Sequence, residues 1–404
     1  MLNLYLFMYA DDTVLFSENI NELQKMIDTV NECSVQNDLH INLSKTKIVV
    51  FRNRGVVKED EKWYLNGSMI DICNEFMYLG LLLNYNGSFT NTQKVLSDQG
   101  KKALFYLYSK THDDFFNVET LISLFDTYVT SIVNYGCEIW GYHKGPDIET
   151  LHLSFLKKIL KVKKCTVNFM VYFELGRLPL YINRYVRMIT CWLKLLSTEN
   201  CILKNIYDDM CENSFIKPND KLNWSCKIRE ILYKFGFNDV WLKQYVVNEK
   251  LFIAEFKQRV IDNFISEALS FFETSPKCSL YQFIHDGHIM QYYLSCSVNY
   301  LYKPFICRYR IHAHSLNIET GRYYNIDRNE RFCNVCNMRV LEDEYHFILE
   351  CEKYNDIRRK YIKPYYYTRP STFKLVQLLS VRNVKTLNNL GKYLYVAEKL
   401  RNSN

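Results

Sequence analysis

Two adjacent carboxylates, Asp11 and Asp12, lie between two apolar runs, and this arrangement constrains the fold of the chain more than any other feature. Residues 4–8 form the apolar run before the acidic pair, and residues 14–16 form the run after it. An apolar strand, a short polar turn and a second apolar strand are typical of a β-hairpin. The sequence therefore predicts a hairpin within residues 1–16 that holds both carboxylates at its tip.

Adjacent carboxylates repel each other, and a divalent cation beside them relieves that repulsion. Oxygen ligands suit Mg²⁺, which binds few carboxylates and keeps positions for the phosphates of a substrate. Two such ions can stabilise the attacking and leaving oxygens of an in-line phosphoryl displacement. A surface hairpin with an acidic turn is the alternative that two acids alone leave open.

Three motifs, in this order along the chain, resemble reverse transcriptases. Tyr9-Ala10-Asp11-Asp12 resembles their palm hairpin, and residues 40–47 with the apolar run 48–51 are similar to the block that follows it. Phe76-Met77-Tyr78-Leu79-Gly80 is similar to the start of the primer-grip hairpin. Further blocks at residues 135–141 and 176–180 resemble the thumb region of the reverse transcriptases of non-LTR retrotransposons (LINE elements).

The resemblance implies RNA-templated DNA synthesis by two-metal nucleotidyl transfer, with an RNA template and a DNA primer or target DNA as partners. It implies that Asp11 is the chief Mg²⁺ ligand and that Asp12 supports it. It also implies that Lys45 or Lys47 assists the phosphates of the nucleotide, and the sequence does not choose between these two lysines. A solvated loop with two lysines is the alternative.

In the family, another palm carboxylate and the fingers precede the acidic hairpin, whereas ten residues precede Asp11 here. Asp113 and Asp114 are no convincing substitute, because we expect them in a polar loop between helices. We therefore expect a truncated polymerase that is inactive alone and that a complementary upstream polypeptide could complete. A zinc-dependent nucleic-acid-binding module, or a relic without function, is the alternative.

A second set of chemical residues has the spacing Cys-x2-Cys-x9-His-x4-Cys and consists of Cys333, Cys336, His346 and Cys351. Two cysteines at this spacing can present both sulfurs to one metal ion, and three thiolates with one imidazole complete a tetrahedron. Such a closed ligand set predicts a structural Zn²⁺ site with no position open for catalysis. The segment also resembles the carboxy-terminal zinc knuckle of LINE proteins.

Arginines and aromatic residues alternate before and within this segment. Guanidinium groups bind phosphates, and aromatic rings stack on unpaired bases, so this pattern predicts a nucleic-acid surface. The predicted contact residues are Arg308, Arg310, Arg322, Arg328, Arg331 and Tyr324. Arg339, Tyr309, Tyr323 and Phe332 share the pattern, and His312 and His314 nearby are alternative but less favoured metal ligands. A lysine-rich stretch at residues 157–164 could follow a phosphate backbone or form a solvated helix face.

The predicted fold class is α+β, with a partial polymerase palm followed by mostly helical regions and a small zinc knuckle. The predicted domains are a partial palm at 1–89, a helical thumb and extension at 90–200, a helical linker region at 201–305 and a zinc-knuckle domain at 306–404. Helices are expected at residues 19–37, 92–110, 118–140, 147–164 and 182–196, and strands at 40–42, 48–51, 63–65, 69–72 and 76–84.

Composition and charge narrow the class of protein without identifying it. The hydrophobic content of 48% is that of a globular protein, and the net charge of +7 permits a polyanionic partner without requiring one. No apolar run approaches the length of a membrane span, and the start of the chain does not read as a secretory signal. The 14 cysteines, which mostly occur singly, fit reduced thiols in an intracellular protein, cytoplasmic or nuclear, with no membrane partner.

Overall fold

The computed structural model describes residues 6–52, 55–111, 116–217, 220, 222–336 and 338–403. It contains two compact units, and each unit is built from three stretches of chain. Unit 1 comprises residues 1–98, 134–145 and 184–253, and unit 2 comprises residues 99–133, 146–183 and 254–404. The four domains predicted from the sequence were assigned from motifs, whereas the two units are defined by how compactly the chain packs. The four domains therefore stay a prediction.

The acidic hairpin forms as expected over the residues that the structure describes. Strands β1 (Leu6–Tyr9) and β2 (Asp12–Leu15) pair antiparallel, and Tyr9 lies opposite Asp12. Helix α1 (Ile20–Gln36) follows, and the side-chain oxygen of Asn19 accepts hydrogen bonds from the backbone N–H groups of Asn21 and Glu22. This N-cap satisfies amide groups that the first helical turn leaves unpaired.

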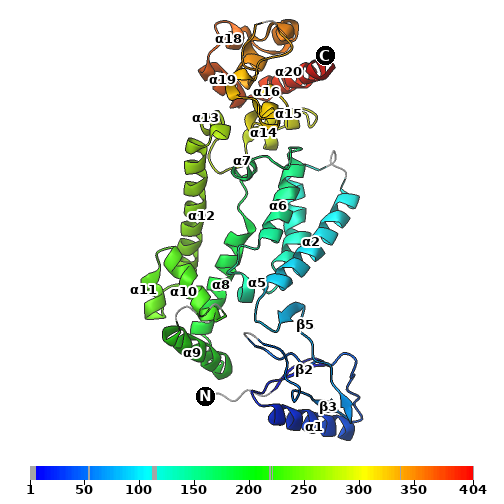
Figure 1. Ribbon diagram of the computed structural model, residues 1–404. Coiled ribbons are helices and arrows are strands. Elements are labelled where there is room, and N and C mark those ends of the chain that lie inside the picture. The colour runs from blue at the N-terminus through cyan, green and yellow to red at the C-terminus, as the bar shows by residue number, and fades with distance from the viewer. Residues whose placement is uncertain are drawn as a thin grey trace. The chain divides into compact units, whose positions relative to one another are not determined.

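Two further hairpins follow α1 in unit 1 (Figure 1). Strands β3 (Tyr64–Leu65) and β4 (Ser68–Met69) join at the predicted Asn66-Gly67 turn, where both residues have positive φ. The single strand expected at 76–84 is wrong, because β5 (Glu75–Tyr78) and β6 (Leu81–Asn84) form a hairpin. The chain reverses at Leu79 and Gly80, which have φ values of 45° and 80°.

The segment between α1 and β3 forms no strand in its described residues, so the strands expected at 40–42 and 48–51 are wrong. A turn replaces the first strand, since the backbone N–H groups of Lys45 and Thr46 donate to the carbonyl of Asn42. Ile48 forms one isolated parallel bridge with Ile72. A strand needs several consecutive rungs, and this segment has one.

A small hydrophobic core holds the amino-terminal part of unit 1 together. Ile27 of α1 packs with Trp63, Leu65 and Ile70 of the β3–β4 region. The indole N–H of Trp63 donates to the backbone oxygen of Ile20 at 3.1 Å, which ties the hairpin to the start of the helix. The packed face of α1 therefore positions β3 and β4, while much of the apolar surface of β1 and β2 is exposed.

The rest of the chain is helical, as the α+β class requires. The helices in its first half are α2 (Thr90–Lys110), α3 (Val118–Phe125), α4 (Ser131–Val133), α5 (Cys137–Trp140), α6 (Pro146–Ile159), α7 (Asn168–Glu174) and α8 (Leu180–Leu196). Those of its second half are α9 (Cys201–Ile216), α10 (Trp224–Lys234), α11 (Asn238–Lys243), α12 (Glu249–Thr274), α13 (Tyr281–Ile284), α14 (Tyr292–Ser295), α15 (Lys303–Arg310), α16 (Asn317–Thr320), α17 (Asn355–Tyr361), α18 (Pro364–Tyr367), α19 (Thr372–Leu379) and α20 (Val384–Ser403).

Two helices expected from the sequence differ from those in the structure. The helix expected at 118–140 is interrupted by a π-helical turn at Asp126–Thr130 and by Gly136, which has a φ of 61°. The helix expected at 147–164 ends at Ile159, and Lys161 has a left-handed φ of 52°. The last lysines of the stretch 157–164 therefore lie beyond the helix.

No helix in the described part of the chain combines the length and the apolar character needed to cross a membrane.

Candidate functional site

The two carboxylates lie at the tip of the β1–β2 hairpin, as predicted. Tyr9 and Asp12 form the last pair of the ladder, so Ala10 and Asp11 make the two-residue turn, and Ala10 has a φ of 53°. Asp11 and Asp12 are both exposed, so a cation could reach them from solvent. Among the described residues, no group of three or more close metal-ligating side chains includes either aspartate. Asp113 and Asp114 lie outside the described residues.

The two lysines predicted to assist the phosphates differ in their surroundings. Lys45 is exposed in the turn that follows Asn42. The ammonium group of Lys47 is 2.6 Å from a carboxylate oxygen of Asp71, and Lys47 lines an open groove of about 610 Å³. Lys58 and Lys62 line the same groove, together with the acidic residues Glu61 and Asp71.

The structure brings together all four predicted zinc ligands. One ligand atom from each of Cys333, Cys336, His346 and Cys351 lies within 4.8 Å of the others, and three of the four residues are buried. The Cys336 sulfur is 3.4 Å from Nε2 of His346. Tetrahedral zinc, with a Zn–S bond of about 2.3 Å and a Zn–N bond of about 2.0 Å, separates such atoms by about 3.5 Å. This cluster could therefore hold one zinc ion.

The backbone around the cluster fixes the positions of its ligands. A bridge between Phe332 and Leu341 closes the loop that carries the first two cysteines, and the N–H of Cys333 donates to the carbonyl of Val340 at 2.8 Å. The N–H of His346 donates to the carboxylate of Asp343, also at 2.8 Å. The Phe332–Leu341 bridge therefore orients the cysteines, and the turn at Asp343 orients the histidine.

The thiols of the cluster influence one another strongly. A hydrogen bond from the Cys351 thiol lowers the pKa of Cys333 to about 3, and the same bond raises the pKa of Cys351. Only one of these two sulfurs can therefore ionise easily without a cation, whereas zinc stabilises all of the thiolates together. Nδ1 of His346 is buried without a hydrogen-bond partner, and Glu350 lies 4.0 Å from it. A carboxylate at this position could orient a metal-bound imidazole.

Four of the predicted nucleic-acid arginines have partners within the protein. Arg310 is 3% exposed and donates to Glu174, Gln291 and backbone carbonyls, so its donors face inward. Arg308 pairs with Glu398, and Arg322 pairs with Glu319. Arg331 donates to the carbonyls of Ile318 and Ile326. These contacts indicate structural roles, and the buried guanidinium group of Arg310 is not accessible to a nucleic acid.

The remaining members of the pattern lie on the surface. Arg328 and Arg339 are exposed, and the rings of Tyr323 and Tyr324 are 61% and 77% exposed. Tyr309, in contrast, is buried and stacks on Phe347 with ring centroids 5.3 Å apart. The alternating sequence pattern therefore mixes surface residues with core residues.

His312 and His314 do not join the cysteines but flank Glu344. Nδ1 of His312 and Nε2 of His314 each lie 2.5 Å from the same oxygen of Glu344. Leu316 donates its N–H to Nδ1 of His314, so the proton of this imidazole is on Nε2 and points at the carboxylate. These three residues could hold a metal ion by type, but their spacing is that of hydrogen bonds. No local pattern in the sequence pointed to Glu344 as their partner.

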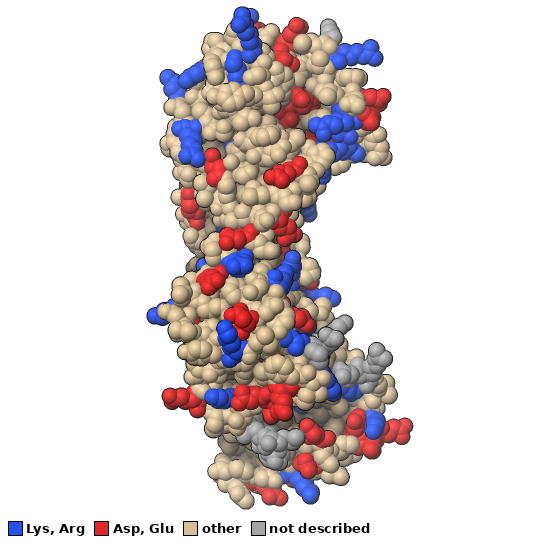
Figure 2. Space-filling view, turned by 90° about the vertical axis from the view of Figure 1, so that its left-hand side faces the viewer, with Lys and Arg blue, Asp and Glu red and all other residues tan. Residues whose placement is uncertain are grey.

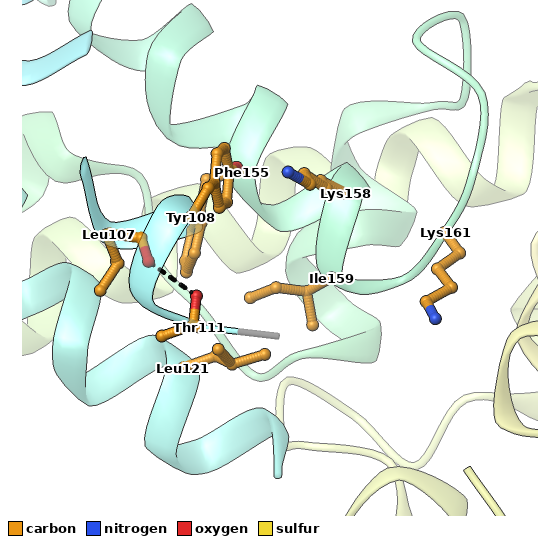
Figure 3. A pocket seen from close by; sticks show the side chains of 8 residues that line it. All are labelled: Leu107, Tyr108, Thr111, Leu121, Phe155, Lys158, Ile159 and Lys161. Carbon is orange, nitrogen blue, oxygen red and sulfur yellow. Dashed lines mark hydrogen bonds between the residues drawn. The ribbon is translucent and has the colours of Figure 1, made fainter. Parts of the chain in front are cut away.

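A small pocket lies between α2, α3 and α6, and Figure 3 shows its lining. Its volume is about 30 Å³, which is room for one water molecule and not for a substrate. The ammonium group of Lys158 lies 3.2 Å from the centroid of the Tyr108 ring at this pocket. Lys158 is therefore engaged with an aromatic ring of its own chain.

Comparisons with known proteins agree with the motifs. Residues 1–83 match the family model of reverse transcriptase (RNA-dependent DNA polymerase). The chain is also 27% identical over 162 residues to an uncharacterized transposon-derived protein of Caenorhabditis elegans, a match that covers 38% of this chain and 56% of that protein. The chain thus spans about half the length of this relative. No solved structure matches the chain. Residues 1–83 of the chain therefore resemble reverse transcriptases, and a stretch of 162 residues resembles a transposon-derived protein.

Proposed function

We propose that this chain supplies the second half of the palm, the thumb and the zinc-knuckle region of a LINE-type reverse transcriptase. The observation that carries the proposal is the position of Asp11 and Asp12 at the exposed tip of a hairpin within the matched residues. Two carboxylates fit Mg²⁺, which when bound supplies charge stabilisation for nucleotidyl transfer. Asp11 is the chief ligand, Asp12 supports it, and Lys45 or Lys47 contacts the phosphates.

We further propose that these 404 residues do not polymerise alone. Two-metal transfer in this family uses a third carboxylate, and among the described residues none stands close enough to Asp11 and Asp12 to form a group of three. The apolar residues of β1, including Phe7, Met8 and Tyr9, are exposed. A complementary polypeptide that carries the upstream palm strands would cover this surface and bring the missing carboxylate.

Primer extension tests this proposal directly. The purified chain, its Asp11→Asn variant and a polypeptide carrying the upstream palm and fingers are combined on an RNA template with a DNA primer and Mg²⁺. We expect extension only from wild type with the upstream polypeptide. Extension by the chain alone that Asp11→Asn abolishes would show that a carboxylate of this chain completes the site. No extension from any mixture would refute the enzymatic function.

A second function, nucleic-acid binding that needs zinc but not the palm site, is favoured by the convergence of the four predicted zinc ligands and by the exposure of Arg328 and Tyr324 in the segment before Cys333. We expect RNA binding to survive Asp11→Asn and Asp12→Asn and to be lost in Cys333→Ser. The zinc content of each variant, measured on the same samples, checks that only Cys333→Ser has lost the metal. Equal binding by Cys333→Ser and wild type would rule this function out.

A further inference from the structure

The structure brings together two basic segments that are far apart in the sequence. The chain leaves α6 at Ile159, and the left-handed conformation of Lys161 turns residues 163–165 toward the carboxy-terminal part of unit 2. There the ammonium group of Lys163 donates to the carbonyl of His314 at 3.1 Å. The Cys165 sulfur lies 3.1 Å from the hydroxyl of Tyr323. The lysine stretch and the arginine–tyrosine segment are therefore neighbours.

We propose that Lys161, Lys164, Tyr323, Tyr324 and Arg328 form one binding surface for single-stranded nucleic acid. This lysine–tyrosine surface rests on the proposed function and extends it, because it names where a strand binds outside the palm. All five residues are exposed. The side chains of Lys164 and Arg328 make no ion pair with any residue in the described ranges, so their charges are available to phosphates.

The other lysines of the stretch hold the segment in place. Lys157 donates to the carbonyl of Lys164 and to the side chain of Asn168, each at 2.7 Å. Burial lowers the pKa of Lys157, as expected for an ammonium group used inside the protein. Lys158 lies over Tyr108, as described above. Lys157, Lys158 and Lys163 therefore hold the segment in place. Lys161 and Lys164 are exposed on its surface.

The loop that carries the two tyrosine rings is held by hydrogen bonds within the protein. Tyr323 and Tyr324 end a 3₁₀ turn at Gly321–Tyr324, and the N–H of Ile326 closes the loop by donating to Gly321 at 3.0 Å. Arg331 donates to the carbonyls of Ile318 and Ile326 on either side of this turn. A Cβ on Gly321 would lie 2.8 Å from Arg331, which shows how closely this side chain packs under the loop.

Arg331, which packs under the tyrosine loop, also connects this loop to the cysteine cluster. Arg331 directly precedes the Phe332–Leu341 bridge, and its carbonyl accepts the N–H of Glu342 at 2.9 Å. A metal ion held by Cys333 and its three companions would keep this bridge closed. The cluster therefore supports the tyrosine loop through Arg331, which acts as a positioning residue and not as a nucleic-acid contact.

The chemistry of this surface selects a single strand. Exposed aromatic rings can stack only on bases whose faces are uncovered, and a duplex covers them. Asp327 and Glu330 lie in the same segment, so the local positive charge is modest, and acidic and basic residues also alternate over the face in Figure 2. Contacts of Lys161, Lys164 and Arg328 with the phosphates of a single strand predict that log Kd rises with log salt with a slope of about 2. We expect weak, salt-sensitive binding in which stacking contributes much of the affinity.

Fluorescence anisotropy with labelled 12-nucleotide oligo(dT) and a 12-base-pair duplex tests the surface in the full chain. We expect the single strand to bind more tightly than the duplex, and Tyr324→Ala to weaken single-strand binding at least about fivefold. Tyr324→Phe keeps the ring and should bind like wild type. The double variant Lys161→Ala/Lys164→Ala should reduce the salt slope by about 1.4. Lys250→Ala/Lys257→Ala, an exposed pair on α12, is the matched control.

The outcomes separate this inference from the proposed function. If wild type binds the strand but neither Tyr324→Ala nor the double lysine variant changes binding, the surface is wrong and nucleic-acid binding by the chain stands. Preference for the duplex also overturns the surface. If wild type binds neither probe, the surface is wrong, while RNA binding still tests the zinc-dependent function and primer extension still tests the enzyme. Zinc content and melting temperature show that each variant is folded.

Discussion

Individual side chains in the carboxy-terminal part differ most from what their types suggest, and Arg310 is the clearest case. Its guanidinium group is buried against Glu174, a residue 136 positions earlier in the chain. Glu174→Gln keeps the shape but leaves the Arg310 charge without a carboxylate. Breaking a buried ion pair from one side costs about 3–5 kcal/mol. We expect this loss in the free energy of unfolding of the variant, measured in urea.

Glu398→Gln is the matched control, since Glu398 pairs with the more exposed Arg308 at 3.1 Å. Partly exposed pairs contribute about 1 kcal/mol or less, so this variant should be almost as stable as wild type. Equal losses in the two variants would show that the Glu174 carboxylate has no special role. Equal stability of Glu174→Gln and wild type would show the same.

His312 predicts a pH dependence of stability. Burial alone lowers the pKa of His312, but the Glu344 carboxylate outweighs burial, and the net pKa is raised. A raised folded-state pKa stabilises the protein fully below the unfolded value of about 6.5, and this stabilisation is lost as the pH rises through the folded pKa. His312→Asn removes the charge, and asparagine tolerates the φ of 53° at this position.

We therefore expect the melting temperature of wild type to exceed that of His312→Asn most at pH 6 and least at pH 9. A series of melting curves over this pH range measures the difference. A gap that is constant with pH would show that His312 contributes by packing and not by charge. A gap that widens as the pH rises would contradict the raised pKa.

At the scale of single residues, the sequence indicated which side chains have suitable chemistry, but it did not predict which residues surround them. The convergence of the four predicted zinc ligands could be predicted because their spacing is local: Cys333 and Cys336 share a turn, and His346 and Cys351 flank the next one. The burial of Arg310 and Tyr309 could not be found, because it depends on partners such as Glu174 that are distant in the sequence. Periodicity within one segment carries no information about such partners.

Helices and strands were likewise predicted correctly where nearby residues determine them, and wrongly where they depend on distant parts of the chain. Helix α1 and the β3–β4 hairpin were predicted because Asn19 and the Asn66-Gly67 pair determine them locally. The strands expected at 40–42 and 48–51 failed because a strand exists only with a partner. The helix expected at 147–164 was too long, since its apolar spacing continues past Ile159 while the backbone turns at Lys161.

Two glycines with positive φ provide a test at the level of the element. Gly176 follows α7 with a φ of 59°, and a Cβ there would lie 2.5 Å from the backbone nitrogen of Met290. Gly287 has a φ of 87°, but nothing lies within 4 Å of its Cβ position. Gly287→Ala should cost about 1 kcal/mol of backbone strain. Gly176→Ala should cost more, because the Leu175–Met290 bridge must also open.

Chemical denaturation of the two glycine variants measures this difference. We expect the midpoint of Gly176→Ala to fall well below that of Gly287→Ala. Equal midpoints would show that the backbone near Met290 moves aside at no cost. Because both variants place alanine at a positive φ, their difference chiefly reports the close contact between the end of α7 and residues 289–290.

On the scale of the whole molecule, all five tryptophans of the chain belong to unit 1, whereas the cysteine cluster belongs to unit 2. Trp63, Trp140, Trp192 and Trp241 are buried, so their emission reports the folding of unit 1. A structural zinc ion stabilises the unit that holds it, because metal binding is coupled to folding. Removing the ion should therefore affect unit 2 and leave the surroundings of the tryptophans unchanged.

Treatment with a zinc chelator, or the substitution Cys336→Ser, tests this expectation. We expect an early transition in circular dichroism at 222 nm, while tryptophan emission excited at 295 nm keeps its wavelength until a separate transition. Cys296→Ser, a cysteine outside the cluster, should retain one zinc ion per chain and behave like wild type. A red shift of the emission on zinc removal would mean that unit 1 needs the metal. Unit 1, which contains Asp11 and Asp12, would then not fold independently of the zinc site. Zinc would in that case be needed for the polymerase function as well as for nucleic-acid binding.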